Sequence, residues 1–313
     1  MRCAGLVAAL ALAAPALAAG DVRLGDIRID DVSVYPESLS ADRAERLYIG
    51  SVKGVIFRTG PADDVAVPWI RPTAENGILS ILGVLVDEKT RTLWACSAPM
   101  PFRVRPATGT SALLAFNLAT GRPKGRFDFP APASACNDVT IARDGTAFAT
   151  DTPNGRIFML KPGAKALRLF AEDAQLKGVD GIAFSGDGKL YVNNVQAQTM
   201  LRIDRKPDGA FAGLTPLVLS QPVKGPDGLR LLAGNRFLQA EGGSGKVTLV
   251  TIDGDRAEIS DLRTGLDSSP GVTVARGRAY AVEGKIGYLV VPALKGKDPG
   301  AFSARAIDLP AAR

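Results

Sequence analysis

The feature that most constrains the fold of this chain is an internal repeat that runs through almost its whole length. Each copy has a short apolar strand, a tight turn and a second strand that ends in small polar residues, as in residues 180–185 and 189–194. The six copies begin at residues 37, 83, 137, 180, 227 and 271, so successive copies are 43 to 54 residues apart. A period of this length is typical of one four-stranded blade of a β-propeller. The sequence therefore predicts an all-β fold, a six-bladed β-propeller whose four-stranded antiparallel blades surround a central channel.

The outer strands of the blades are also visible in the sequence. Third and fourth strands follow most copies, and in the last blade we expect residues 286–291 and 304–308 to form them. A ring of blades must close, and either the C-terminal strand near Ile307 or the N-terminal segment near Ile27 supplies the outer strand of the last blade. No stretch has a helical period over several turns.

The first residues form a separate unit. Arg2 precedes a short apolar run at residues 6–12, and Ala-Leu-Ala follows at residues 16–18, a pattern typical of a secretion signal that is removed. We therefore expect a signal peptide at residues 1–19, a single propeller domain at residues 20–313, and an exported protein, periplasmic or secreted. No other apolar stretch is long enough to cross a bilayer, so we expect no membrane insertion.

Composition excludes several classes of function. The chain contains no histidine, which removes histidine triads and dyads and most zinc or copper sites. Its formal net charge is only +6, and its basic residues are scattered among acids, so we expect no nucleic-acid partner. Any catalysis must then use carboxylates, lysine, tyrosine or a hard metal ion.

Residues at the start of the inner strands form a ring around the channel, because the inner strands of all blades converge there. The repeat places Gly83 and Gly271 at two of the six positions, whereas the residues at the other four have side-chain oxygen atoms. Carboxylates crowded around a narrow axis repel one another and require a cation. Oxygen ligands suit a hard divalent ion, and calcium tolerates an irregular shell better than magnesium. The sequence predicts one Ca²⁺, or another divalent cation, held by Glu37, Asn137, Asp180 and Asp227.

Each of these residues also has an ordinary structural interpretation. Asp-Gly pairs at residues 180–181 and 227–228 suit turns, and Asn137 could cap its own backbone. Their coincidence in one register of the repeat favours the metal site.

The blade starts resemble those of a known family. The segments at residues 36–39, 136–139, 179–183 and 225–228 resemble, in order, the blade-start motifs of the gluconolactonase/senescence-marker-protein (regucalcin) family and of diisopropyl fluorophosphatase. The resemblance implies that the calcium ion is catalytic and that Asp227 is the base or nucleophile in ester hydrolysis. Two departures stand out. Asp180 replaces the usual Asn of the family, and Ala135 stands where sugar lactonases often have Arg, which argues against a sugar lactone as substrate.

Further candidates lie at the ends of the second strands. Asn194, Glu241 and Glu283 face the predicted metal rim, so we expect them to bind substrate, with hydrogen bonds to neighbouring loops as the alternative. Cys96 and Cys136 lie at the same end of neighbouring blades, and export permits a disulfide between them. The alternative is two buried small hydrophobic residues.

Two functions of different classes follow. The first is an exported calcium-dependent hydrolase of a lactone or related ester, in which the metal polarises the carbonyl and Asp227 acts as base or nucleophile; we expect a monomer acting on a small molecule. The alternative is a non-catalytic binding propeller with a structural metal. A metal-free propeller like strictosidine synthase is disfavoured by the four oxygen ligands.

Overall fold

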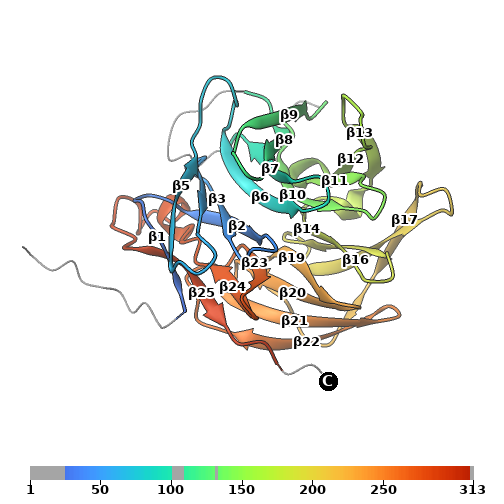
Figure 1. Cartoon of the computed structure of the whole chain (residues 1–313). Coiled ribbons are helices and arrows are strands. Elements are labelled where there is room, and N and C mark those ends of the chain that lie inside the picture. The colour runs from blue at the N-terminus through green and yellow to red at the C-terminus, as the bar shows by residue number, and fades with distance from the viewer. Residues whose placement is uncertain (1–24, 101–108, 131–132, 311–313) are drawn as a thin grey trace, which may run out of the picture.

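The computed structural model describes residues 25–100, 109–130 and 133–310, and within them the chain is almost entirely β-strand (Figure 1). The predicted signal peptide, residues 1–19, lies outside the described residues. The few helical turns are α1 (Gly287–Val290) and the 3₁₀ segments η1 (Thr152–Asn154) and η2 (Ala174–Leu176). No helix in the described ranges is long and apolar enough to cross a membrane.

Antiparallel four-stranded sheets recur along the chain, as the repeat predicts. Three sheets consist of four strands in sequence order. They are β6 (Ser80–Asp87), β7 (Thr92–Ala98), β8 (Ala112–Asn117) and β9 (Pro123–Asp128); β10 (Cys136–Ile141), β11 (Ala147–Asp151), β12 (Arg156–Leu160) and β13 (Arg168–Glu172); and β14 (Val179–Phe184), β15 (Leu190–Asn194), β16 (Thr199–Arg205) and β17 (Phe211–Pro216). A fourth sheet adds the short strand β18 in parallel to its outer edge. Its strands are β19 (Pro226–Ala233), β20 (Arg236–Glu241), β21 (Lys246–Asp253), β22 (Arg256–Arg263) and β18 (Val218–Leu219).

The fifth sheet contains both ends of the described chain. Its eight strands run in the order β2 (Pro36–Ala41), β3 (Leu47–Ser51), β4 (Ile56–Arg58), β5 (Val65–Ile70), β1 (Ile27–Ile29), β25 (Phe302–Ile307), β24 (Arg278–Val282) and β23 (Val272–Ala275). All pairs in it are antiparallel except β1 with β5, which are parallel. The sheet thus consists of two four-stranded halves. The half that contains the last copy of the repeat has β25 as its third strand and β1 as its outermost strand. Segments from both ends of the described chain therefore close the ring, where the sequence had left the choice between them open.

The prediction of a strand at residues 286–291 is wrong. This apolar segment forms α1 and leaves Val290 51% and Val291 41% exposed. The place beside β24 is taken by β25, which buries Phe302 and Ala304 in the core. Lys285 Nζ holds the segment against the start of β25 by donating to the carbonyl of Ala301 at 2.9 Å.

The first strands of the repeats form a closed ring at the centre of the molecule (Figure 1). Going round it, β2 packs against β6, then β10, β14, β19 and β23, and β23 packs back against β2. The apolar core lies between neighbouring sheets, where Phe148 of one sheet, for example, packs edge-on against Phe184 of the next. Burying an aromatic side chain of this size contributes about 1.5–3 kcal/mol, so the core holds the sheets, and the ring residues they carry, in fixed relative positions.

A β-bulge interrupts the start of five of the six first strands. The register shifts lie between Pro36 and Ser38, Ile81 and Val84, Cys136 and Val139, Val179 and Ile182, and Pro226 and Leu229. Bulges re-aim side chains and are common beside functional sites. Here each of them contains the residue that the repeat places at the channel.

Close contacts between neighbouring inner strands correct the predicted alignment of two glycines. A Cβ on Gly83 would lie 2.5 Å from the carbonyl oxygen of Asn137, and a Cβ on Gly271 would lie 2.8 Å from that of Glu37. Gly181 makes the same close approach, 2.2 Å, to the carbonyl oxygen of Asp227. Gly83 and Gly271 are therefore equivalent to Gly181 and stand one position after the ring. The ring positions in those two blades belong to Leu82 and Pro270.

Candidate metal and catalytic site

The four oxygen-bearing ring residues come together in the structure, as the sequence predicts. They line one small cavity at the channel with a volume of about 10 Å³, enough for roughly one water-sized sphere. The lining residues are Glu37, Ser38, Gly83, Asn137, Asp138, Asp180, Asp227, Gly228 and Pro270. Each lies within the first four residues of an inner strand or, for Pro270, two residues before one, so the ring geometry of the fold alone gathers these distant residues.

The hydrogen bonds within the cluster do not use all of its side-chain acceptor oxygens. Asn137 Nδ2 donates to Asp180 Oδ2 and to Thr152 Oγ1, both at 2.9 Å. Both bonds use the amide nitrogen, so the amide oxygen of Asn137 stays available as a ligand. Asp180 Oδ1 is buried and has no hydrogen-bond partner. A buried orphan carboxylate oxygen is costly, and a bound cation is one way of satisfying it.

The backbone beneath the cluster is held by side chains of the neighbouring sheets. Thr150 Oγ1 donates to the carbonyl of Asp180 at 2.9 Å, and Asn193 Nδ2 donates to the carbonyl of Asp227 at 2.5 Å. Each bond joins the second strand of one sheet to the first strand of the next. They fix the carbonyl side of each ring residue and leave its carboxylate to the cavity.

Crowding and burial raise the pKa of all three carboxyl groups. Burial, and then the charge of Asp138, raise the pKa of Glu37 from 4.5 to about 7. Burial raises the pKa of Asp180 well above its ordinary value, assisted by the charges of Glu37 and Asp138 and opposed by hydrogen bonds with the carboxyl group of Asp227 and from Asn137. Burial and the charges of Asp180 and Glu37 likewise raise the pKa of Asp227. Without a cation the cluster therefore favours keeping protons.

The donor set fits a hard divalent cation. Three carboxylates and one amide offer only oxygen, the ligand type that calcium prefers, and the orphan oxygen of Asp180 lies among them. Across the described ranges, no group of three or more His, Cys, Asp or Glu side chains has the close arrangement of a formed metal shell. The assignment of ligands thus stays a prediction that rests on chemistry and convergence.

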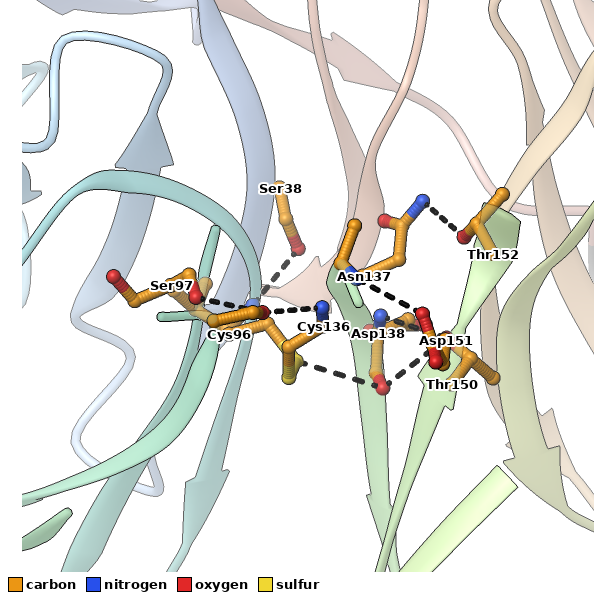
Figure 2. Close-up of a disulfide and its surroundings, with 12 residues drawn as sticks. Ser38, Cys96, Ser97, Cys136, Asn137, Asp138, Thr150, Asp151 and Thr152 are labelled. Atoms are coloured by element: carbon orange, nitrogen blue, oxygen red, sulfur yellow. Dashed lines mark hydrogen bonds between the residues drawn. A yellow bond between two sulfur atoms is a disulfide. The ribbon is translucent and has the colours of Figure 1, made fainter. Parts of the chain in front are cut away.

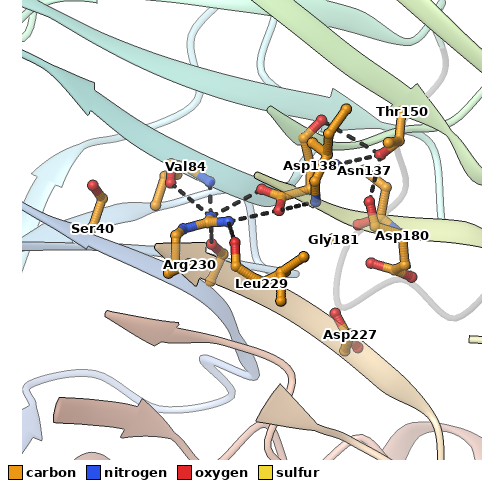
Figure 3. Close-up of polar contacts among 12 residues, drawn as sticks. Ser40, Val84, Asn137, Asp138, Thr150, Asp180, Gly181, Asp227, Leu229 and Arg230 are labelled. Atoms are coloured by element: carbon orange, nitrogen blue, oxygen red, sulfur yellow. Dashed lines mark hydrogen bonds and ion pairs between the residues drawn. The ribbon is translucent and has the colours of Figure 1, made fainter. Parts of the chain in front are cut away.

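An ion pair that the repeat pattern does not predict lies beside the cluster (Figure 3). Arg230, on β19, crosses the channel to Asp138, on β10, with Nη1 2.6 Å from Oδ2 and Nη2 2.9 Å from Oδ1. Such a two-pronged pair is the strong geometry for guanidinium and carboxylate. Arg230 therefore compensates the charge of Asp138 at close range, and a bound cation would meet the −3 of Glu37, Asp180 and Asp227 in their ionised forms.

The predicted disulfide is present. Cys96 at the end of β7 is bonded to Cys136 at the start of β10, with the two Cα atoms 5.0 Å apart (Figure 2). It links two neighbouring sheets directly before the bulge that carries Asn137. The crosslink therefore also anchors one of the candidate ligands.

The three predicted substrate-binding residues lie outside the lining of the small cavity and bond to their own loops. Asn194 Nδ2 donates to the carbonyls of Gln175 and Lys177. Glu241 accepts from the Lys224 backbone N–H at 2.9 Å and from Ser244 Oγ at 2.8 Å.

Glu283 is used in the same way. Its Oε2 lies 2.6 Å from Arg305 Nε, and its Oε1 accepts from the backbone N–H of Asp267. Asn194 and Glu241 thus hold neighbouring loops, the alternative considered from the sequence, and Glu283 holds a loop and strand β25. Direct contact of these residues with substrate stays a prediction.

Comparisons with known proteins give a likeness of fold. No protein-family model matches the chain, and no curated protein sequence matches it. Among solved structures, the Malassezia sympodialis allergen Mala s 1 has a TM-score of 0.68 at 16% identity, covering 90% of this chain and 96% of that one. A gluconolactonase from Xanthomonas campestris has a TM-score of 0.61 at 18% identity, covering 88% and 87%. A catalytically inactive histidine-to-alanine variant of virginiamycin B lyase from Staphylococcus aureus has a TM-score of 0.58 at 12% identity, covering 91% and 98%.

The fold and the ring of inner strands therefore define a β-propeller protein. Its fold resembles that of gluconolactonases and their structural relatives, which confirms at the level of fold the resemblance drawn from the blade starts.

Proposed function

We propose that this chain is an exported, calcium-dependent hydrolase of a lactone or related ester, built as a six-bladed β-propeller. The count of six takes the eight-stranded sheet as two blades that meet at the parallel pair of β1 and β5. Export is supported by the leader-like N-terminus and by the disulfide, which suits an oxidising compartment.

The observation that carries the proposal is the convergence of three carboxylates and one amide on a cavity with an unsatisfied buried oxygen. Glu37, Asn137, Asp180 and Asp227 would hold the ion through their oxygen atoms. When bound, a divalent cation supplies a Lewis acid that polarises the ester carbonyl. Cation binding favours the ionised carboxylates, so it would release the protons that the crowded cluster otherwise holds.

Asp227 is the residue best placed to act on a proton. Asp180 is buried at 4% exposure, whereas Asp227 and Glu37 are both partly exposed as residues. Exposure therefore disfavours Asp180, and the choice of Asp227 over Glu37 rests on the resemblance of its blade start. In the proposed reaction water adds to the carbonyl carbon and its proton passes to the Asp227 carboxylate. The ester C–O bond then breaks, and the leaving alkoxide takes the proton back.

The lyase chemistry of a structural neighbour is not carried over. The inactive virginiamycin B lyase variant lacks one histidine, and this chain contains none at all. Ala135, at the position where sugar lactonases often have arginine, likewise directs the search beyond sugar lactones to aryl esters and phosphotriesters.

A second candidate, a non-catalytic propeller with a structural metal, is favoured by the size of the cavity. Its 10 Å³ holds about one small sphere and no substrate. The two candidates differ in one property, which is turnover.

The deciding experiment pairs metal analysis with a hydrolysis screen. Purified protein is assayed on lactones, aryl esters and phosphotriesters, with and without a chelator, beside Asp227→Asn and the exposed-turn control Asp208→Asn. The hydrolase proposal expects calcium-dependent turnover that Asp227→Asn abolishes and Asp208→Asn leaves unchanged. Bound calcium with no turnover on any substrate would support the scaffold.

A further inference from the structure

The repeat supplies its own comparison for the pair of Arg230 and Asp138. The residue that follows each ring position is small and neutral in five blades and acidic in one: Ser38, Gly83, Asp138, Gly181, Gly228 and Gly271. The residue three positions after each ring position is neutral in five blades and basic in one: Ser40, Leu85, Thr140, Ala183, Arg230 and Thr273. The two exceptional residues are the two that bond to each other. At these two positions of the repeat, the channel therefore contains one pair of opposite charges, and the equivalent residues of the other blades are uncharged.

Arg230 connects four of the inner strands. Besides its two contacts with Asp138 on β10, its Nη1 donates to the carbonyl of Leu229 at 2.8 Å. Its Nη2 donates to the carbonyl of Val84 on β6 at 3.3 Å and to Ser38 Oγ on β2 at 3.4 Å. The side chains of Arg230 and Asp138 are only 11% and 5% exposed. Figure 3 shows the guanidinium between these strands, with Asp180 and Asp227 beyond Asp138.

The pair separates two cavities of very different size. Asp138 lines the 10 Å³ cavity with the three carboxylates. Arg230 lines a cavity of about 650 Å³ at the opposite ends of the inner strands, among residues such as Ala41, Ile141 and Leu231. The guanidinium therefore lies across the channel between the acidic cluster and the wide far mouth.

We propose that Arg230 is a built-in counter-cation, which neutralises Asp138, closes the channel behind the acidic cluster and limits that cluster to a single divalent cation. Without it all four carboxylates that line the cavity would be uncompensated, a charge of −4 in place of −3 when they are ionised. Arg230 is thus a positioning and specificity residue for the ion, and this role rests on the metal site of the proposed function.

Calorimetric calcium titration of charge-changing variants tests the inference. Arg230→Met leaves Asp138 uncompensated and should tighten binding by on the order of tenfold, or admit a second ion, because the neighbouring charges interact in a poorly screened interior. Asp138→Asn leaves the guanidinium uncompensated and should weaken binding by a similar factor. The double variant Asp138→Asn/Arg230→Met restores the net charge and should return to one ion at close to the original affinity. Asp204→Asn removes one charge of an outer, part-exposed ion pair and serves as the control with unchanged affinity.

The opposite signs of the two single variants are what a merely structural tie would not produce. If Arg230 serves only to hold the strands together, both single variants lose thermal stability but bind calcium with unaltered affinity and stoichiometry. That result overturns the inference and leaves the metal site intact. If Arg230→Met does not fold, weaker binding by Asp138→Asn and its recovery in the double variant still support the inference, and unchanged binding in both refutes it. Absence of calcium binding by the unmodified protein would overturn the metal site and the inference together.

Discussion

Loss of protons from the acidic cluster should make the calcium-free protein less stable as the pH rises. The pKa of Glu37 is raised from 4.5 to about 7 in the folded state, by burial and by the charge of Asp138. A carboxyl group with a raised folded pKa binds its proton more tightly in the folded than in the unfolded chain. The free energy of unfolding then falls with rising pH, since the native state holds more protons over this range.

The magnitude follows from the pKa of Glu37. Below pH 4.5 the group is protonated in both states and contributes nothing. Above pH 7 it is ionised in both, and the full difference of about 2.5 pKa units corresponds to roughly 3 kcal/mol of lost stability. The pKa values of Asp180 and Asp227 are raised in the same direction, so these groups add to the loss at higher pH.

Urea unfolding in the presence of a chelator at pH 5, 6, 7 and 8 measures this loss directly. Excess calcium should remove it, because the ion binds the ionised cluster of the folded state and stabilises it by RT ln(1 + [Ca²⁺]/Kd). The stabilisation by calcium should therefore grow with pH. Glu37→Gln cannot ionise and should flatten the part of the profile between pH 5 and 7. A chelated protein whose stability is constant or increases from pH 5 to 7 would refute the reasoning.

Four further outcomes are expected. Asp227→Asn should keep the fold and still bind calcium, weakened by on the order of tenfold for the lost charge, but abolish hydrolysis even at saturating calcium, because an amide oxygen ligates calcium and is no base. Full turnover by Asp227→Asn would show that Asp227 is only a ligand. Activity lost in Glu37→Gln should be partly rescued by added calcium. Replacing both cysteines by serine removes a crosslink over a sequence separation of 40 residues and should cost about 4 kcal/mol in the free energy of unfolding; an unchanged urea midpoint would contradict this. Gly181→Ala should lower the melting temperature sharply, because its Cβ would lie 2.2 Å from the carbonyl oxygen of Asp227, whereas Gly287→Ala, whose nearest neighbour is 3.4 Å away, should not.

Several features could be predicted from the sequence because they depend on local periodicity. A strand needs only alternation over a few residues, and a blade needs only four strands joined by short turns, so the period of the repeat was sufficient to predict the antiparallel sheets. The same period placed Glu37, Asn137, Asp180 and Asp227 on one ring, since equivalent positions of a cyclic repeat must meet at its axis. It also brought Cys96 and Cys136 to the same end of neighbouring sheets.

Other features were decided only by the tertiary structure. Gly83 and Gly271 lie one position after the ring, as their close approach to the backbone of the neighbouring inner strand shows, and such contacts between strands are not visible in the sequence. The closure through β1 and β25 joins segments from opposite ends of the chain.

The pairing of Arg230 with Asp138 joins residues 92 positions apart. Within their own copies of the repeat, Arg230 and Asp138 have the pattern of ordinary strand residues, because their role depends on a contact across the channel. A local pattern can indicate which residues face the axis. Only the folded ring shows which of their charges neutralise each other and which are left for a ligand, because that depends on distances between strands far apart in the sequence.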